Sequence, residues 1–382
     1  MFPIINHIDD VLPHIAGNDN IVVNRKDDYI VIDYILNTPD TFNNPYDKEC
    51  RGLLFNADGT IMARRLHKFF NVNERPEALV ENLDLSKPHW ILEKLDGSMI
   101  TPMITHGLLT WGSKAGVTFL TPQIEEFVKV NDNYRDFAEF MMMIGYTPIF
   151  EWCSRKNRIV IDHPFDRLVL IAIRDTVTGE YQPYDYFDTY KKNYGIEVVN
   201  QYLGTVANMQ QLAEDIKGMS GIEGFVIRFA DGHMVKVKCD EYCRYHRAKD
   251  DISREKNVIS ILINGQADDF KGLLMKEDKE TLERFEHDFW IEFSEVAEFK
   301  ILDILQEVKY RDISRKDFAL GYTKLNGHVR AIIFKLFDKP DVTHADVMTE
   351  MLEVIKKNIN HHDKVRFLWG GLNWDNYRLG LS

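Results

Sequence analysis

The chain has 382 residues, of which 45% are hydrophobic, and its formal net charge is −13. This composition favours a protein with a packed core over a disordered one. No apolar stretch approaches the roughly 18 residues of a membrane-spanning helix, and the acidic start of the chain does not resemble a signal peptide. Residues 1–246 and 247–382 are both net negative. An extended basic surface for nucleic acid is therefore excluded, and any contact with a polyanion must use a local patch.

The four cysteines are Cys50, Cys153, Cys239 and Cys243. They form no CxxC pair, and their spacing is not that of a disulfide framework. The sequence therefore predicts a reduced, cytoplasmic protein whose thiols are packed in the core.

The first two-thirds of the chain predict short strands separated by turns and helices. The β-branched runs lie at 29–36, 51–65, 168–175 and 224–238. Asp58-Gly59 and Asp231-Gly232 each stand between two apolar runs, which is the strongest short-range signal for a β-hairpin. Segments 121–130 and 134–145 have the pattern of helices.

From about residue 250 the pattern becomes helical. Apolar residues recur at three- and four-residue steps, which is typical of one face of a helix. They are Leu282, Phe285, Phe289, Phe293, Val296 and Phe299. Segments 328–339 and 344–358 are similar, with Pro340 between them. The sequence thus predicts an α+β fold, in which a domain of antiparallel sheets with helices (1–248) precedes an all-helical domain (249–382).

Lys94 stands at the end of an apolar run, in the segment Lys94-Leu95-Asp96-Gly97. The pattern places this lysine at the end of a strand, facing a cleft. A lysine amine attacks phosphorus only in its neutral form, so a catalytic lysine needs particular surroundings. Taken alone, a lysine before an Asp-Gly turn is more often a solvated residue. The other charged residues of the chain make the catalytic explanation of Lys94 the stronger one.

Lys236 and Lys238 alternate with Val235 and Val237 in the strand that follows Asp231-Gly232. Because side chains alternate between the faces of a strand, both lysines lie on one face. Two ammonium groups on a buried face repel each other unless a polyanion lies between them, and a triphosphate satisfies that need. Solvated lysines on an edge strand are the alternative explanation of this pattern.

These charged residues belong to a longer series of motifs that occur in a set order. The motifs are KECRG, LHKFFNVNE, KLDGS, WGSKAG, FEWCSRKNRIV, GIEG and VKVK. Over residues 45–250 they resemble the bacteriophage RNA ligase 1 family, ATP-dependent tRNA-repair ligases of the covalent lysyl-nucleotidyltransferase superfamily. The resemblance implies a nucleotidyltransferase fold and an RNA ligase that joins 5′-phosphate and 3′-OH ends.

The resemblance also implies roles for individual residues. Lys94 is the implied nucleophile that carries AMP, and Asp96, Lys236 and Lys238 are implied to assist catalysis. The residues implied to bind ATP are Arg51, Lys68, Phe70, Lys94, Gly97, Lys114, Glu151, Glu223, Gly224, Lys236 and Lys238. Glu151 is expected at a strand end, and Phe70 is expected to form an apolar wall.

A divalent cation, Mg²⁺ or Mn²⁺, is implied as the cofactor, with Glu151 and Glu223 holding it in part through water. Asp268 and Asp269, early in the helical domain, are a further candidate pair, although an acidic pair at a helix start also complements the helix dipole. The family's helical domain helps to select broken tRNA. The resemblance therefore implies a nicked tRNA anticodon loop as substrate, and a monomer acting in a phage-infected bacterial cell.

Two other functions are compatible with part of these observations. An mRNA capping guanylyltransferase also uses a KxDG lysine, but it normally ends in an OB barrel rather than in helices. A non-catalytic RNA-binding relative would have little reason to keep every charged pocket residue, and its surface should be more basic.

Overall fold

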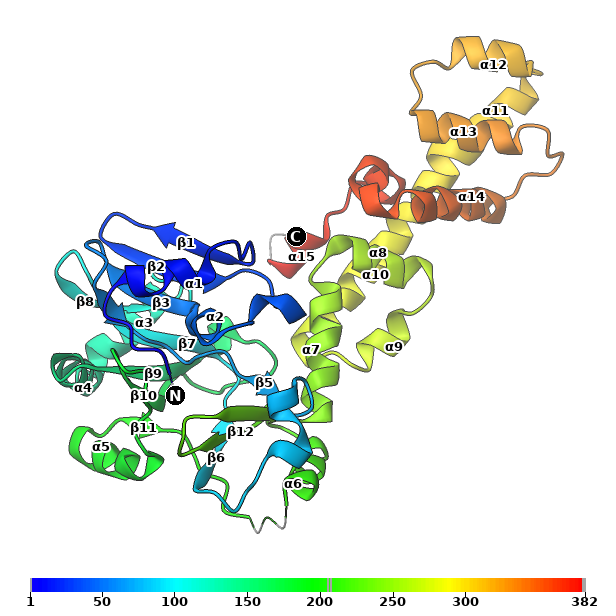
Figure 1. The fold of residues 1–382 in the computed structure, drawn as a ribbon. Coiled ribbons are helices and arrows are strands. Elements are labelled where there is room, and N and C mark those ends of the chain that lie inside the picture. The colour runs from blue at the N-terminus through cyan, green and yellow to red at the C-terminus, as the bar shows by residue number, and fades with distance from the viewer. Residues whose placement is uncertain (1, 205, 207, 380–382) are drawn as a thin grey trace. The chain divides into compact units, whose positions relative to one another are not determined.

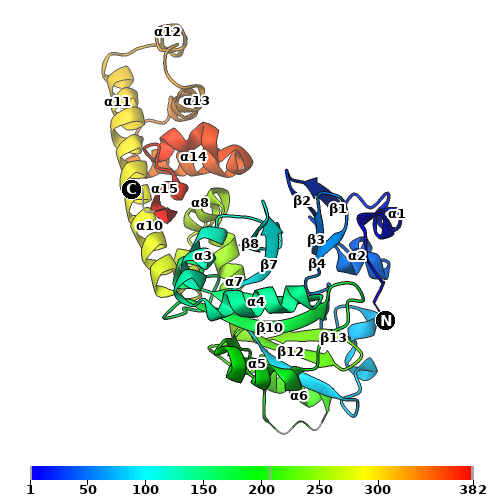
Figure 2. The ribbon, with the colours of Figure 1, turned by 90° about the vertical axis from the view of Figure 1, so that its left-hand side faces the viewer.

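The structure is a computed structural model that describes residues 2–204, 206 and 208–379. The chain divides into two compact units, 1–243 and 244–382, and the division falls inside helix α7 (Asp240–Ile252). The sequence placed the boundary slightly later, after residue 248. Figures 1 and 2 show the strands of the first unit and the helices of the second. Among the described residues, no helix is both long and apolar enough to cross a membrane.

The described part of the first unit contains three sheets. The first sheet is an antiparallel meander whose strands lie in chain order. They are β1 (Ile21–Arg25), β2 (Tyr29–Tyr34), β3 (Arg51–Asn56) and β4 (Ile61–Ala63). The predicted Asp58-Gly59 turn joins β3 to β4, and Gly59 adopts a positive φ of 93°, which glycine tolerates without strain.

The second sheet is the largest and has the order β11-β10-β9-β7-β8. Its strands are β7 (Ser98–Thr105), β8 (Leu108–Gly112), β9 (Tyr146–Cys153), β10 (Arg167–Asp175) and β11 (Glu197–Val198). Only the β10–β11 pair is parallel within the described sheet. A buried cluster that includes Trp111, Phe137, Phe150 and Trp152 joins this sheet to helices α3 (Thr121–Val130), α4 (Asn133–Met143) and α5 (Phe187–Tyr194).

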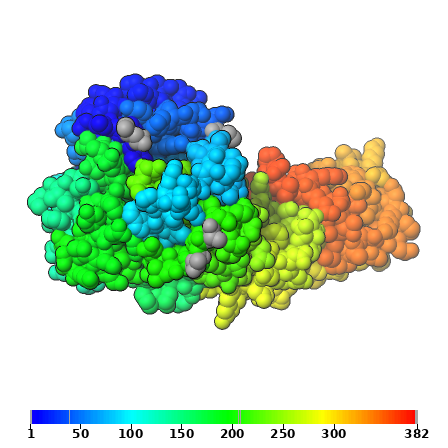
Figure 3. Space-filling view, turned by 60° about the horizontal axis from the view of Figure 1, so that its bottom comes forward, coloured from blue at the N-terminus to red at the C-terminus, as the bar shows by residue number. Residues whose placement is uncertain are grey.

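The third sheet has the order β5-β13-β12-β6. Its strands are β5 (Phe70–Asn71), β6 (His89–Lys94), β12 (Gly224–Phe229) and β13 (Met234–Lys238). The predicted Asp231-Gly232 turn joins β12 to β13. Helix α6 (Met209–Lys217) packs against β12, β13 and the turn Val80–Asn82. Figure 3 shows these green and light-blue segments side by side at the surface.

A buried ion cluster ties the first sheet to the second. Glu49, at the end of α2 (Pro45–Glu49), accepts hydrogen bonds from Arg64 Nε at 3.0 Å and from Arg174 Nη2 at 2.7 Å. All three side chains are buried. Although burial acts to raise the pKa of Glu49, the positive charges of Arg174 and Arg64 lower it to about 2. The carboxylate is therefore ionised, and it compensates two guanidinium groups that would otherwise be isolated in the core.

The second unit is helical, as predicted. It continues α7 and adds α8 (Glu255–Ile263), α9 (Ala267–Lys271), α10 (Lys276–Ala297), α11 (Asp303–Tyr310), α12 (Arg315–Gly321), α13 (Gly327–Leu336), α14 (His344–Lys357) and α15 (Trp374–Arg378). The apolar series on α10 is buried from Leu282 to Val296.

The last member of that series, Phe299, does not continue the buried face, because it is 65% exposed. It lies in a π-helical turn, Glu298–Leu302, which follows α10 directly. Such a turn adds a residue and rotates the helix face that follows. Ile301 and Leu302 are buried instead.

We expect Glu49→Gln to lower the free energy of unfolding by about 3–5 kcal/mol, because it leaves two buried guanidinium groups without their counter-charge. Urea denaturation measures this loss. Glu77→Gln is the matched control, because the Lys48–Glu77 pair is partly exposed and contributes under about 1 kcal/mol. An equal loss in both variants would contradict a special role for the buried cluster.

The same cluster should make the wild type sensitive to acid. The pKa of Glu49 is lower in the folded state than in the unfolded state. Its contribution is therefore complete above the unfolded pKa and is lost as the pH falls from about 4.5 towards 2. The Glu49→Gln variant should lack this part of the acid-induced loss of stability, which unfolding curves at several pH values would show.

Candidate active site

Lys94 is the last residue of β6, and the turn Leu95–Gly97 leads directly into β7. Because β6 belongs to the third sheet and β7 to the second, the Lys94 turn crosses from one sheet to the other. On β12, Gly224 is paired with Lys94 on one side and with Lys238 of β13 on the other. This register brings two lysines from distant parts of the sequence to the same end of the sheet.

Gly224 is required by the close approach of the neighbouring strand. A Cβ at this position would lie 2.0 Å from the carbonyl oxygen of Val237, and the backbone has a φ of 146°. Any other residue would therefore push β13 away and displace Lys238 from its position beside Lys94.

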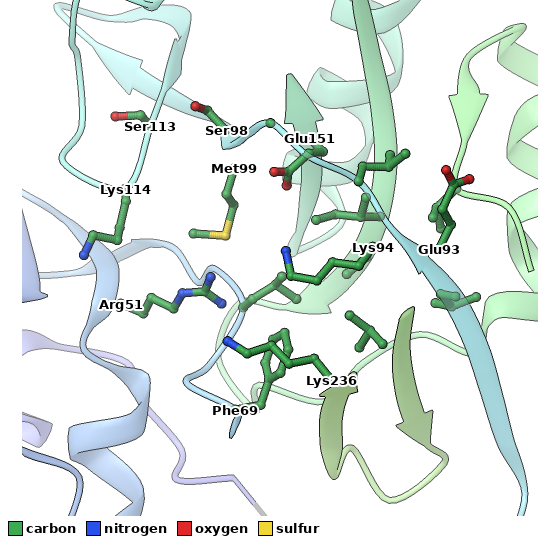
Figure 4. A pocket seen from close by; sticks show the side chains of 18 of the residues that line it. Arg51, Phe69, Glu93, Lys94, Ser98, Met99, Ser113, Lys114, Glu151 and Lys236 are labelled. Atoms are coloured by element: carbon green, nitrogen blue, oxygen red, sulfur yellow. The ribbon is translucent and has the colours of Figure 1, made fainter. Parts of the chain in front are cut away.

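The Lys94 side chain enters a cavity of about 510 Å³. Of the residues named from the sequence, those that line it are Arg51, Lys94, Gly97, Lys114, Glu151, Lys236 and Lys238. Figure 4 shows Lys94, Arg51 and Lys236 pointing towards one another from three separate segments, with the Glu151 carboxyl group nearby. The cavity also contains Ser98 and Asn157, which the sequence did not single out.

Glu223 joins two of these lysines. Its Oε1 atom lies 2.8 Å from Lys94 Nζ and 2.8 Å from Lys238 Nζ. The Glu223 side chain is only 4% exposed, whereas the two lysine side chains remain partly open to solvent. One buried carboxylate therefore holds both ammonium groups at the wall of the cavity.

Two further cations of the cavity, Lys236 and Arg51, have no comparable counter-charge. Among the described residues, no carboxylate forms an ion pair with Lys236 or Arg51, and Arg51 Nε is buried without a hydrogen-bond partner. Burial, followed by the positive charges of Lys94 and Arg51, lowers the pKa of Lys236 to about 7. Lys236 thus loses its proton more easily than an ordinary lysine.

Of the two adjacent phenylalanines, Phe69 lines the cavity and Phe70 does not. The apolar wall expected of Phe70 is therefore formed by Phe69, whose ring lies 5.6 Å from the Arg51 guanidinium and 5.5 Å from Lys236 Nζ. Phe70 is on the other side of the segment, because consecutive residues of an extended chain face opposite ways.

Lys68 does not line the cavity. Its ammonium group lies within 5.5 Å of the ring centres of Tyr34, Phe42 and Phe70. Burial lowers the pKa of Lys68 to about 8. Lys114 does line the cavity, but its Nζ atom is paired with Asp33 at 3.0 Å and lies 4.0 Å from the Tyr34 ring centre.

Glu151 lies inside strand β9 rather than at the strand end that its sequence pattern indicated. Burial, together with the negative charges of Glu223 and Asp96, raises its pKa to about 7, although Lys94 acts in the opposite direction. Gly97 allows the Lys94 turn to lie close to β9 and Glu151, because a Cβ at this position would lie 2.4 Å from the carbonyl oxygen of Trp152.

Asp96 is buried and does not line the cavity. Its carboxylate accepts hydrogen bonds from the backbone N–H groups of Val160 at 2.7 Å and Ile161 at 2.6 Å, and from the Tyr242 hydroxyl at 2.7 Å. Asp96 therefore anchors the Lys94 turn. Tyr242 was missed from the sequence, because nothing local indicates a contact with a residue 146 positions away.

The helical unit holds the remaining candidates. Asp268 and Asp269 are exposed on the short helix α9, where Asp268 pairs with Lys271 at 3.0 Å. No group of three or more His, Cys, Asp or Glu side chains among the described residues is arranged to hold a metal ion. The four cysteines are free thiols, and only Cys243 is not buried.

Comparisons with known proteins show which family the chain belongs to. A family model described as RNA ligase, of the T4 RNA ligase 1 type, matches residues 49–242. A putative RNA ligase of Thermovibrio ammonificans is 30% identical over 273 residues, which cover 69% of this chain and 70% of that protein. RNA ligase 1 of bacteriophage TS2126 is 23% identical over 220 residues, 54% of each chain.

Among solved structures, an archaeal ATP-dependent RNA ligase is a distant likeness, with a TM-score of 0.45, 15% identity and coverage of 72% of this chain and 74% of that chain. The family match spans half of the chain and contains every cavity residue discussed above. The chain therefore belongs to the phage RNA ligase 1 family of RNA ligases.

Proposed function

We propose that this RNA ligase uses ATP to join RNA 5′-phosphate and 3′-OH ends through a covalent AMP on Lys94. The observation that carries the proposal is the position of Lys94 Nζ. It lies in a cavity, 2.8 Å from buried Glu223, beside cations that lack counter-charges of their own. A polyanion such as the triphosphate of ATP supplies the missing negative charge.

In the first step, Lys94 Nζ gives up a proton to the Glu223 carboxylate and attacks the α-phosphorus of ATP. A nitrogen–phosphorus bond forms, the bond from phosphorus to the bridging oxygen breaks, and pyrophosphate leaves together with the second proton of the nitrogen. Arg51, Lys236 and Lys238 stabilise the charge that builds on the phosphate oxygens. Such transfers depend mainly on positioning and charge neutralisation.

Two further transfers complete the reaction. An RNA 5′-phosphate attacks the phosphorus on Lys94 and forms a 5′–5′ pyrophosphate with AMP. The electron pair of the broken bond returns to the lysine nitrogen, which takes back the proton held by Glu223. The 3′-OH of the other RNA end then attacks the 5′-phosphorus, a phosphodiester forms, and AMP leaves. Lys94 is free again for the next molecule of ATP.

The residues present fit a divalent cation only in part. Glu151 offers an oxygen ligand that has no ion pair among the described residues, whereas Glu223 is already shared by two lysines. Mg²⁺ or Mn²⁺ bound at Glu151, with phosphate oxygens and water completing its coordination, would neutralise phosphate charge. The cation would also favour the ionised form of Glu151.

The finer points of the function rest on the family alone. We propose that the substrate is a nicked tRNA anticodon loop, that the helical unit helps to select it, and that the protein acts as a monomer in the cytoplasm of a phage-infected bacterium. Asp268 and Asp269 remain candidates for metal or RNA contacts in that unit.

We expect Lys94→Ala to abolish the covalent label that wild-type protein acquires from α-labelled ATP and a divalent cation, because no other group replaces the attacking nitrogen. Label retained by the denatured protein is the measurement. Pre-adenylated RNA should still be sealed, since that step needs no lysyl adduct. Lys87→Ala, an exposed lysine just before β6, is the matched control and should label normally.

A normal adduct in Lys94→Ala would contradict the assignment of the nucleophile. Label from α-labelled GTP but not from ATP would indicate a capping-type guanylyltransferase. Protein that takes label from neither nucleotide, after removal of any AMP already attached, would indicate a binding-only relative.

A second prediction concerns pH. The pKa of Lys236 is lowered to about 7, so the cationic fraction of this side chain falls as the pH rises through about 7. We expect the KM for ATP in adduct formation to rise as the pH increases from about 6 to 9. Lys236→Arg keeps its charge throughout this range, and its KM should change less. A wild-type KM that is constant with pH would contradict this prediction.

A further inference from the structure

One buried charge in the cavity has no role in the mechanism above. Arg228, on β12, is 1% exposed and contributes to the lining of the cavity. Two of its guanidinium nitrogens, Nε and Nη1, have no hydrogen-bond partner among the described residues. A buried donor without an acceptor is costly, and it therefore requires an explanation.

No carboxylate among the described residues forms an ion pair with the Arg228 guanidinium. Its Nη2 atom donates one long hydrogen bond, 3.3 Å, to the carbonyl oxygen of Gln182. The guanidinium otherwise faces aromatic rings, with Trp90 at 5.3 Å and Phe187 at 5.8 Å from their centres. Burial lowers the pKa of Arg228 only to about 10, so the side chain is charged at neutral pH. Arg64 and Arg174, by contrast, share the carboxylate of Glu49.

The register of the third sheet places Arg228 relative to the reacting lysine. Lys94 pairs with Gly224, and Arg228 lies four positions further along the same strand, paired with Trp90. Residues two apart on a strand share a face, so Gly224 and Arg228 belong to the same face. At about 3.3 Å per residue they are roughly 13 Å apart along the strand, a span of the order of a nucleoside with its phosphate.

The cavity wall between these two positions is largely apolar. Between them, Leu92 of β6 pairs with Val226 of β12, and Val226 pairs with Lys236 of β13 on its other side. Met234 of β13 lies beside Arg228, and Ile171 of β10 also contributes. From one end to the other, the cavity thus presents cations for a phosphate, an apolar stretch that suits a flat ring, and a single charged donor. This is the order of chemical groups in a nucleotide that is bound with its phosphate at Lys94.

We propose that Arg228 donates a hydrogen bond to a ring-nitrogen acceptor on the edge of the purine of ATP, and so positions the nucleotide for attack by Lys94. The proposal rests on the function proposed above. It makes Arg228 a positioning residue for the base, remote from the reacting phosphorus. Its effect should therefore appear in nucleotide affinity and should depend on the acceptor atom of the base.

The test uses AMP, which has no pyrophosphate to lose and therefore cannot react. Wild-type protein, first cleared of attached AMP with pyrophosphate, is titrated calorimetrically with AMP and with 1-deaza-, 3-deaza- and 7-deaza-AMP. Each analogue lacks one ring-nitrogen acceptor. We expect one of them to bind about 10–100-fold more weakly than AMP, which is the loss typical of a hydrogen bond to a charged group.

The same titrations on Arg228→Met complete a double-mutant cycle. The variant should bind AMP about 10–100-fold more weakly than wild type, and it should no longer distinguish the sensitive analogue from AMP. Thermal melting checks that the variant is folded, and Arg228→Lys replaces it if it is not. Arg135→Met removes a guanidinium that pairs with Glu125 outside the cavity. This control should keep the wild-type pattern.

The outcomes separate the two proposals. Equal binding of AMP and all three analogues by wild type, or an unchanged analogue penalty in the Arg228 variant, would overturn the role of Arg228. Wild-type protein that binds AMP but never acquires label from ATP would instead contradict the lysyl–AMP mechanism, and the analogue pattern would still decide whether Arg228 contacts the base.

Discussion

The ion pair of Glu223 with both Lys94 and Lys238 is the contact on which the rest of the site depends. It joins the end of β6 to the end of β13 across Gly224, and the glycine allows the strands to approach closely enough. Because Glu223 is buried, its charge is poorly screened, and the attraction to each lysine is correspondingly strong. Lys236 and Arg51 take no part in this contact, and their positive charges are available to a bound phosphate.

An acidic protein can still bind a polyanion if its few useful cations converge. The chain carries 60 acidic residues against 47 lysines and arginines. Three strands, β3, β6 and β13, nevertheless bring Arg51, Lys94, Lys236 and Lys238 into one cavity. The acidic remainder limits non-specific binding of RNA, so that affinity for nucleic acid is confined to a small area.

Much of this arrangement could be predicted from the sequence, because it depends on local patterns. Alternation in β13 placed Lys236 and Lys238 on one face, and the Asp-Gly pairs located both hairpins. Other features depend on tertiary contacts and could not be predicted. Whether Phe69 or Phe70 lines the cavity depends on which face of one short segment meets β13, and the contact of Tyr242 with Asp96 joins residues far apart in the sequence.

The low pKa of Lys236 has a consequence for the energetics of nucleotide binding. This side chain becomes increasingly neutral as the pH rises above about 7, whereas a bound phosphate favours its protonated form. Binding at such a pH therefore draws a proton from the solution. The buffer must release that proton, so the heat measured on binding will include the ionisation enthalpy of the buffer and will differ between buffers of the same pH.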